Sequence, residues 1–89
     1  MSIGKEHLKP NKMNAPQEVF EEMRSIATQI WQTFDNQFGY VDEKLARVNS
    51  LENIGDNAMI FFRMFDWKRQ DQFIKLAPLN VLDYINENQ

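Results

Sequence analysis

Residues 16–34 read Pro-Gln-Glu-Val-Phe-Glu-Glu-Met-Arg-Ser-Ile-Ala-Thr-Gln-Ile-Trp-Gln-Thr-Phe, and they carry the strongest periodic signal in the chain. Apolar residues recur there at three- and four-residue spacing, which predicts a helix with one broad apolar stripe. Asn14 is placed to cap this helix, Pro16 suits its first turn, and Gln17 completes the spacing of a capping box. Gly39 fits as the C-terminal stop of the helix. The stripe comprises Val19, Phe20, Met23, Ile26, Ala27, Ile30, Trp31 and Phe34.

A second helix is expected to begin at Asp42, because apolar residues keep helical spacing from Val41 to Phe65. Gly55 interrupts this pattern, but the spacing on both sides stays in phase. That favours one long, bent helix over two separate ones. The charged stretch 66–71 is expected to be a connector or an exposed turn.

The C-terminal residues predict one or two further short helices. Residues 73–77 form a short apolar patch, which Pro78 ends unless it opens the next helix. Residues 79–85 then have the pattern of a short amphipathic helix. The expected fold class is all-α: an antiparallel helical hairpin with one or two short C-terminal helices. Because a hairpin buries only one face of each helix, we also expect a homo-oligomer.

Composition predicts two regions of opposite charge. Residues 1–13 carry three lysines and one glutamate, and we expect a flexible basic arm there. Residues 14–89 carry seven basic and twelve acidic groups, a net charge of −5, and we expect a single helical domain there. An acidic domain is a poor binder of duplex DNA. The N-terminus lacks an apolar signal segment and no apolar run could span a bilayer, so a cytoplasmic protein without a membrane partner is expected.

Catalytic and metal-binding motifs are not recognisable in the sequence. There is no cysteine, and His7 is the single histidine. Carboxylates such as Asp42 and Glu43 stand where helices are expected to begin, which is typical of capping residues. We therefore predict that the protein is not an enzyme and has no metal site and no cofactor.

The segment 58–69 interleaves aromatic, methionine and cationic residues. Ala58, Phe61 and Phe65 are in phase with the core face of the expected hairpin. Met59, Phe62 and Trp67 are not, and such residues are enriched at interfaces, so we predict that they form a partner or oligomer interface. Nucleotide stacking and plain core are the alternatives for this segment.

A ligand-binding hypothesis uses the cationic and aromatic residues together. Phosphate groups would meet lysine and arginine side chains, and bases would stack on aromatic rings. Tyr40 and Trp67 are the candidate stacking residues. The candidate anion contacts are Lys9, Lys12, Arg24, Arg63, Lys68 and Arg69.

A basic N-terminal segment, a Pro16-led helix and a second helix follow one another along about two-thirds of the chain. The residues that mark this layout are His7, Pro10, Met23-Arg24, Leu45-Ala46, Leu51-Glu52 and Asn57-Ala58. The layout resembles the small phage anti-CBASS sponge proteins, which are helical oligomers that sequester cyclic oligonucleotide signals. The family's second helix is rich in alanine, whereas this one is rich in phenylalanine and methionine and is interrupted by Gly55. Residues 66–89 have no counterpart. The resemblance implies that Lys9, Lys12 and Arg24 contact phosphate.

These observations favour a non-catalytic binding protein. The leading hypothesis is a phage or mobile-element accessory factor that inhibits a host protein through an acidic and aromatic surface. The alternative is an oligomeric sponge for a cyclic (oligo)nucleotide signal. A second alternative is a structural component of a larger assembly.

Overall fold

Five helices make up the described part of the chain in the computed structural model, which describes residues 14–36 and 39–89. They are α2 (Gln17–Gln32), α3 (Tyr40–Ser50), α4 (Ala58–Arg63), α5 (Trp67–Leu76) and α6 (Leu79–Asn88). No strand occurs in these residues, so the predicted all-α class is confirmed. None of these helices combines the length and the apolar composition that crossing a membrane would require.

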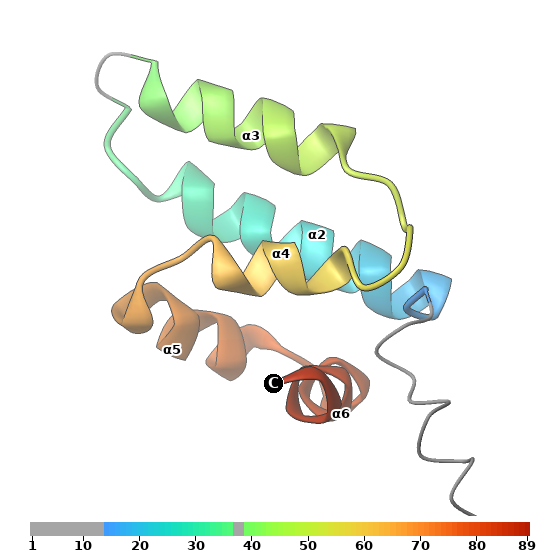
Figure 1. The fold of residues 1–89 in the computed structure, drawn as a ribbon. Coiled ribbons are helices and arrows are strands. Elements are labelled where there is room, and N and C mark those ends of the chain that lie inside the picture. Colours follow the sequence, from blue (N-terminus) through green and yellow to red (C-terminus); the bar gives the residue numbers. More distant parts are fainter. Residues whose placement is uncertain (1–13, 37–38) are drawn as a thin grey trace, which may run out of the picture.

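Helix α2 is the centre of the fold, because it packs against each of the other four helices. Figure 1 shows α3 and α4 running along α2, with α5 and α6 on the side of α2 away from α3. The apolar stripe predicted for residues 19–31 is buried throughout, and Phe34 is partly buried. A stripe this broad can face several helices at once.

The second predicted helix is wrong in its extent. Instead of one long helix, α3 ends at Ser50, Leu51 is extended, and the chain reverses through residues 51–57 before α4 begins (Figure 1). Gly55 lies in this loop with φ +58°, a left-handed conformation that glycine adopts without steric cost. The in-phase spacing on both sides of Gly55 arises because α3 and α4 each turn an apolar face toward α2, and such faces need not be continuous.

Two of the predicted helix boundaries are also wrong. Helix α2 ends at Gln32 with Thr33 as its C-terminal cap, whereas Gly39, at φ +75°, stands directly before α3. Asn14 does not cap α2; its side chain instead accepts a hydrogen bond of 2.8 Å from the backbone N–H of Gly55. The capping-box spacing was therefore present without the capping contact.

The charged residues that follow Asp66 are helical and are not a connector. Asp66 caps α5, since its side chain accepts a 3.0 Å hydrogen bond from the backbone N–H of Arg69. Phe73 of α5 is fully buried, with its ring 5.4 Å from that of Phe62 in an edge-to-face contact. The helix thus covers one side of α4.

Met59 and Phe62 lie in the core, so the prediction that they face outward is wrong. Met59 is fully buried and Phe62 is 7% exposed. Phe61 faces α2, where its ring lies 5.1 Å from that of Phe20. Helix α4 packs against both α2 and α5 and is therefore covered on more than one side. The phase argument failed because it counted as core only the face that packs in the expected hairpin, whereas Phe73 of α5 covers Phe62 on a second side.

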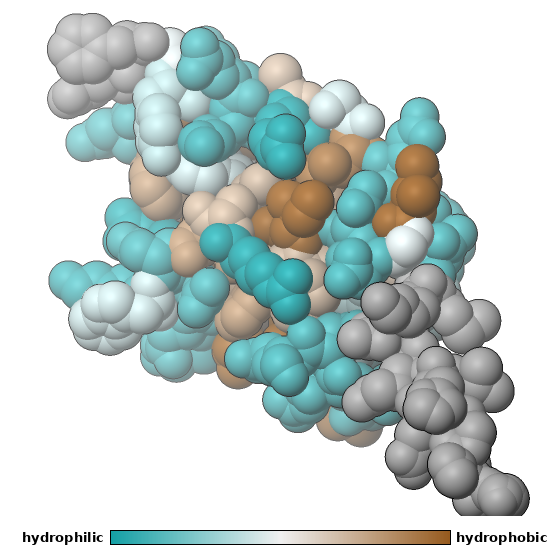
Figure 2. Space-filling view, in the orientation of Figure 1, coloured by the Kyte–Doolittle hydropathy of each residue, from teal (hydrophilic) through white to brown (hydrophobic). Residues whose placement is uncertain are grey.

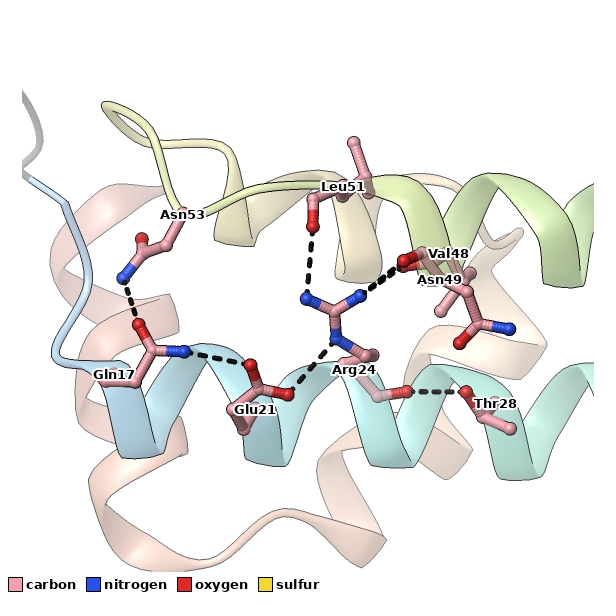
Figure 3. Close-up of polar contacts among 8 residues, drawn as sticks. All are labelled: Gln17, Glu21, Arg24, Thr28, Val48, Asn49, Leu51 and Asn53. Carbon is pink, nitrogen blue, oxygen red and sulfur yellow. Dashed lines mark hydrogen bonds and ion pairs between the residues drawn. The ribbon is translucent and has the colours of Figure 1, made fainter.

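The guanidinium of Arg24 holds the end of α3 against α2 (Figure 3). Its Nη1 donates to the carbonyl oxygens of Val48 (3.0 Å) and Asn49 (2.9 Å), and its Nη2 donates to that of Leu51 (3.0 Å). Nε pairs with the Glu21 carboxylate at 3.2 Å. The last carbonyls of a helix have no partner within the helix. Arg24 supplies those partners from a neighbouring helix.

The loop after α3 is tied to the start of α2 at a second place. Asn53 Nδ2 donates to the carbonyl oxygen of Ala15 at 2.7 Å, beside the contact between Gly55 and Asn14. It also lies 3.4 Å from Oε1 of Gln17 (Figure 3). Side chains therefore fix the reversal of the chain at both ends of the loop.

Helix α6 carries buried polar groups. The Tyr84 hydroxyl and the Asn88 Oδ1 have no hydrogen-bond partner among the described residues. Arg63 donates to the carbonyl oxygen of Asn88 at 3.0 Å. Burial raises the pKa of the Tyr84 hydroxyl above its ordinary value of 10.0, the Asp56 carboxylate raises it further, and Arg63 acts in the opposite direction.

We predict that Arg24→Met lowers the free energy of unfolding by about 2–3 kcal/mol, because three carbonyls lose charge-assisted hydrogen bonds. Arg24→Lys should recover little of it, since an ammonium lacks the planar fork of a guanidinium. Urea unfolding followed by circular dichroism measures both. Arg47→Met, at an exposed arginine of α3, is the matched control. Equal losses in Arg24→Met and Arg47→Met would contradict the role of Arg24.

Tyr84→Phe should leave stability at pH 7 unchanged or raise it by about 1 kcal/mol, because it removes a buried, unpaired hydroxyl. As the pH rises through 10, the unfolded chain releases the tyrosine proton before the folded chain does, and the wild type loses stability. The variant lacks this loss, so its advantage should widen above pH 10 in urea unfolding. A difference that stays constant from pH 7 to pH 11 would contradict the argument.

Candidate interaction surface

The exterior of the protein is rich in carboxylates. Twelve of the thirteen acidic residues lie among the described residues, Glu6 being the exception, and all twelve are exposed. Hydrophilic residues dominate the face seen in Figure 2. The twelve are Glu18, Glu21, Glu22, Asp35, Asp42, Glu43, Glu52, Asp56, Asp66, Asp71, Asp83 and Glu87.

Little of this negative charge is compensated by ion pairs. Within residues 14–36 and 39–89, Glu21 pairs with Arg24 and Asp71 pairs with Lys75, each at 3.2 Å. The other ten carboxylates form no ion pair within those ranges. Uncompensated surface charge of one sign produces a long-range field that attracts partners of opposite charge.

Two cationic side chains lie over aromatic rings where α2 ends and α3 begins. The guanidinium carbon of Arg69 is 4.5 Å from the centre of the Phe34 ring. The Lys44 ammonium is 5.5 Å from the Tyr40 ring and 5.9 Å from the Trp31 ring. Trp31 itself contacts Phe34 and Tyr40, with ring centres 4.6 and 5.7 Å apart. These cation–π contacts stabilise the aromatic cluster and direct part of the positive charge inward.

Trp67 is the most exposed large apolar residue of the described chain, at 74%. It is the first residue of α5, and the Lys68 ammonium lies 5.7 Å from its ring. Trp67 is thus exposed to solvent, and its role as an interface residue stays a prediction. Of the three predicted interface residues, Trp67 alone is exposed to solvent.

The predicted anion contacts within the described residues do not come together at one site. Arg24 is committed to the carbonyls at the end of α3 and Arg63 to the carbonyl of Asn88, so neither is arranged as a phosphate-binding group. Lys68 is exposed and Arg69 covers Phe34. Lys9 and Lys12 lie outside the described residues. Tyr40 is 48% exposed but packs edge-on against Trp31, while Trp67 stands on α5.

Sequence reasoning missed an exposed apolar region where α5 joins α6. Leu76 is 49% exposed and Leu79 is 72% exposed. A signal for Leu79 was present, because the helical face that Val81, Tyr84 and Ile85 share lies on the other side of α6. Leu76 had no such signal, since it continues the apolar patch that Phe73 begins.

A shallow groove of about 270 Å³ lies between side chains of α2 and α5. Its apolar lining residues are Ile30, which is buried, and Leu76, which is half-exposed. Its polar lining residues are Gln29, Thr33, Gln72 and Lys75. Small-molecule sites usually occupy roughly 300–1,000 Å³, so this groove suits one large side chain better than a nucleotide.

No three histidine or acidic side chains of the described residues come together as a metal-binding group. The described surface offers exposed carboxylates and a few exposed apolar side chains. Comparison of the chain with protein-family models, with curated proteins and with solved structures gives no match in any of the three.

Proposed function

We propose that this chain is a non-catalytic binding protein whose acidic exterior recognises a basic surface on another protein. The observation that carries the proposal is the distribution of charge: twelve exposed carboxylates, of which two are ion-paired within the described residues. Three cationic side chains are partly buried, Arg24 against backbone carbonyls and Lys44 and Arg69 over aromatic rings. The exposed carboxylates therefore outnumber the exposed cations among the described residues.

The specific form of the proposal is an accessory factor of a phage or mobile element that blocks a host protein. Host surfaces that bind nucleic acid are basic, because they neutralise phosphate groups. An acidic protein competes for such a surface, and complementary charge speeds and orients their encounter. A small rigid body that presents carboxylates on several helices suits this form of inhibition.

A cyclic-nucleotide sponge is the second candidate function. It is favoured by the pairing of exposed aromatic rings with neighbouring cations, Tyr40 with Lys44 and Trp67 with Lys68. The engagement of Arg24 and Arg63 by backbone carbonyls argues against it, because two candidate phosphate contacts are already occupied. We therefore place it second.

Thermal unfolding against a panel of cyclic di- and oligonucleotides separates the two functions. A bound nucleotide at a hundredfold excess over its dissociation constant stabilises the folded state by about 2.7 kcal/mol. We expect no shift in the melting temperature with any member of the panel. A shift of several degrees that depends on Lys44 or Lys68 would favour the sponge instead.

The acidic surface is tested by charge removal. The tagged protein is used to capture host proteins at low salt, and the association rate with the purified partner is then measured. We expect the rate constant to fall about tenfold between 50 and 500 mM salt, because salt screens exposed charges. The quadruple variant Glu18→Gln, Glu22→Gln, Asp42→Asn, Glu43→Gln should associate more slowly at low salt and lose most of this salt dependence.

Arg47→Gln is the matched control for this experiment, because it removes an exposed positive charge from α3 and should not slow association. Circular dichroism shows whether the quadruple variant keeps its helices. Two results would contradict the proposed function: an association rate that does not change with salt, or a quadruple variant that binds the captured partner as fast as the wild type does.

A further inference from the structure

We propose that the exposed face of α5 binds an amphipathic helix of another protein, one whose apolar row is flanked by carboxylates. The face consists of Trp67, Lys68, Asp71, Ile74 and Lys75, all of which are exposed, and we call it the α5 face. This inference goes beyond the proposed function, because it adds a second surface for a partner of the opposite charge. The lysines and apolar residues of the α5 face take no part in the proposed function, so either can fail without the other.

The α5 face points away from the core. Phe73 is the only buried residue of α5, and Asp71, two residues earlier, lies about 160° from it around the helix axis. The side of α5 around Asp71 is therefore turned to solvent. Trp67 and Ile74 lie on this side and are 74% and 36% exposed. Exposed apolar residues gathered on one helix face indicate an interaction site.

The α5 face is organised in two rows. Trp67 and Ile74 are seven residues apart, as are Lys68 and Lys75. Seven residues make almost two turns of a helix, so each pair is aligned along the axis with its members about 10 Å apart. One row is apolar and the other cationic, and Asp71 lies between them.

The spacing of these rows matches a helix better than an extended strand. Helices that pack along one another bring apolar residues together at a seven-residue repeat and flank them with charged residues that pair across the contact. A strand repeats the residues of one face about every 6.6 Å, which does not match a spacing of about 10 Å. A partner helix would therefore meet Trp67 and Ile74 with its own apolar row.

Charge complementarity predicts the flanks of the partner helix. Helix α5 carries three basic residues and one acidic residue, a net charge of +2, whereas the other described residues carry four basic and eleven acidic residues, a net charge of −7. Lys75 pairs with Asp71 at 3.2 Å, but both groups are exposed and such a pair is worth little, so Lys75 stays available. Carboxylates beside the apolar row of the partner would meet Lys68 and Lys75.

The same charges disfavour a polyanion as the partner. Nucleic acid needs clustered cations to neutralise successive phosphates, and the α5 face offers two lysines with a carboxylate between them. An anionic bilayer presents a surface far wider than one helix, and the net charge of −7 on the other described residues would oppose its approach. A single partner helix is narrow enough to contact the α5 face alone.

The expected complex is weak. Two apolar side chains and two lysines on a helix of 10 residues form a small contact area. Interfaces that bury less than about 1,200 Å² in total belong to weak and transient complexes. We expect a dissociation constant on the order of 10–100 μM.

A model peptide tests the α5 face in the full chain. The probe is a peptide of about 21 residues without tryptophan, with leucine at the a and d positions of its heptads and glutamate at the e and g positions. Trp31 is 2% exposed and gives a constant emission, so a change in emission reports Trp67. We expect a saturable blue shift that weakens with salt. The same peptide with lysine in place of glutamate should leave the emission of Trp67 unchanged.

Variants separate recognition by the α5 face from a general effect of charge. Lys75→Glu should weaken binding of the glutamate peptide about fivefold. Arg47→Glu makes the same change of charge at an exposed arginine of α3 and should bind as the wild type does. The double variant Lys68→Glu, Lys75→Glu should lose the response to the glutamate peptide and gain one to the lysine peptide. Ile74→Gln, which keeps every charge and the tryptophan reporter, should weaken binding about tenfold. Circular dichroism confirms that each variant is folded.

Four results would overturn the proposal. The glutamate peptide could fail to bind at millimolar concentration, or Arg47→Glu could weaken it as much as Lys75→Glu does. The emission of Trp67 could respond instead to oligothymidylate or to phosphatidylserine vesicles, which would assign the face to a nucleic acid or a membrane. It could also shift with the concentration of the chain alone, which would assign the face to a second copy.

The two proposals are separated by the same variants. The double variant keeps the carboxylates of α2 and α3, so its capture of a basic partner would uphold the proposed function alone. The quadruple variant of Glu18, Glu22, Asp42 and Glu43 keeps the α5 face, so its binding of the glutamate peptide would uphold the further inference alone.

Discussion

The chain reverses between α3 and α4, and the Arg24 guanidinium is the contact that makes this reversal stable. A helix that ends next to a core leaves backbone carbonyls with no partner, and burying them unpaired is costly. Arg24 donates to the carbonyls of Val48, Asn49 and Leu51 at 2.9–3.0 Å. Its guanidinium also lies 5.0 Å from the Phe20 ring, on the boundary of the core. One side chain thus joins the end of α3 to the helix around which everything packs.

The burial of α4 depends on that reversal. If residues 40–65 formed one helix, Met59 and Phe62 would face away from α2, and a single contact face could not cover both. The loop instead returns the chain along α2, and α5 then closes the second side through the contact between Phe73 and Phe62. A segment that is apolar on nearly all sides can be buried in 89 residues because it is only six residues long and is enclosed by other helices. The small size of the domain favours short helices.

The sequence predicted the helical class and the buried stripe from Val19 to Trp31, because periodicity reports which face of a helix is apolar. The sequence could not predict the contacts of Arg24, because its partners are backbone carbonyls 24–27 residues away. Every residue has a backbone carbonyl, so no residue type marks these partners. The sequence of α5 also has no apolar stripe to detect, since Phe73 is the only residue of that helix that is fully buried. Among the candidate site residues, the exposure of Trp67 agrees with its being out of phase with the apolar spacing of Ala58, Phe61 and Phe65. The burial of Phe62 depends on Phe73 of α5, a helix whose first residues have the charged composition of a connector.

Why Trp67 remains outside follows from how the other aromatic residues are used. Trp31 contacts Phe34, Tyr40 and Phe65, and its indole N–H donates to the sulfur of Met64 at 3.1 Å. Trp31 therefore has aromatic neighbours and a partner for its indole N–H without Trp67. Asp66 caps α5, and Trp67 is the first residue of that helix. The cap sets the direction of the helix, Phe73 sets its rotation by entering the core, and Trp67 must then point to solvent. Its exposure is therefore imposed by two contacts that stabilise the fold.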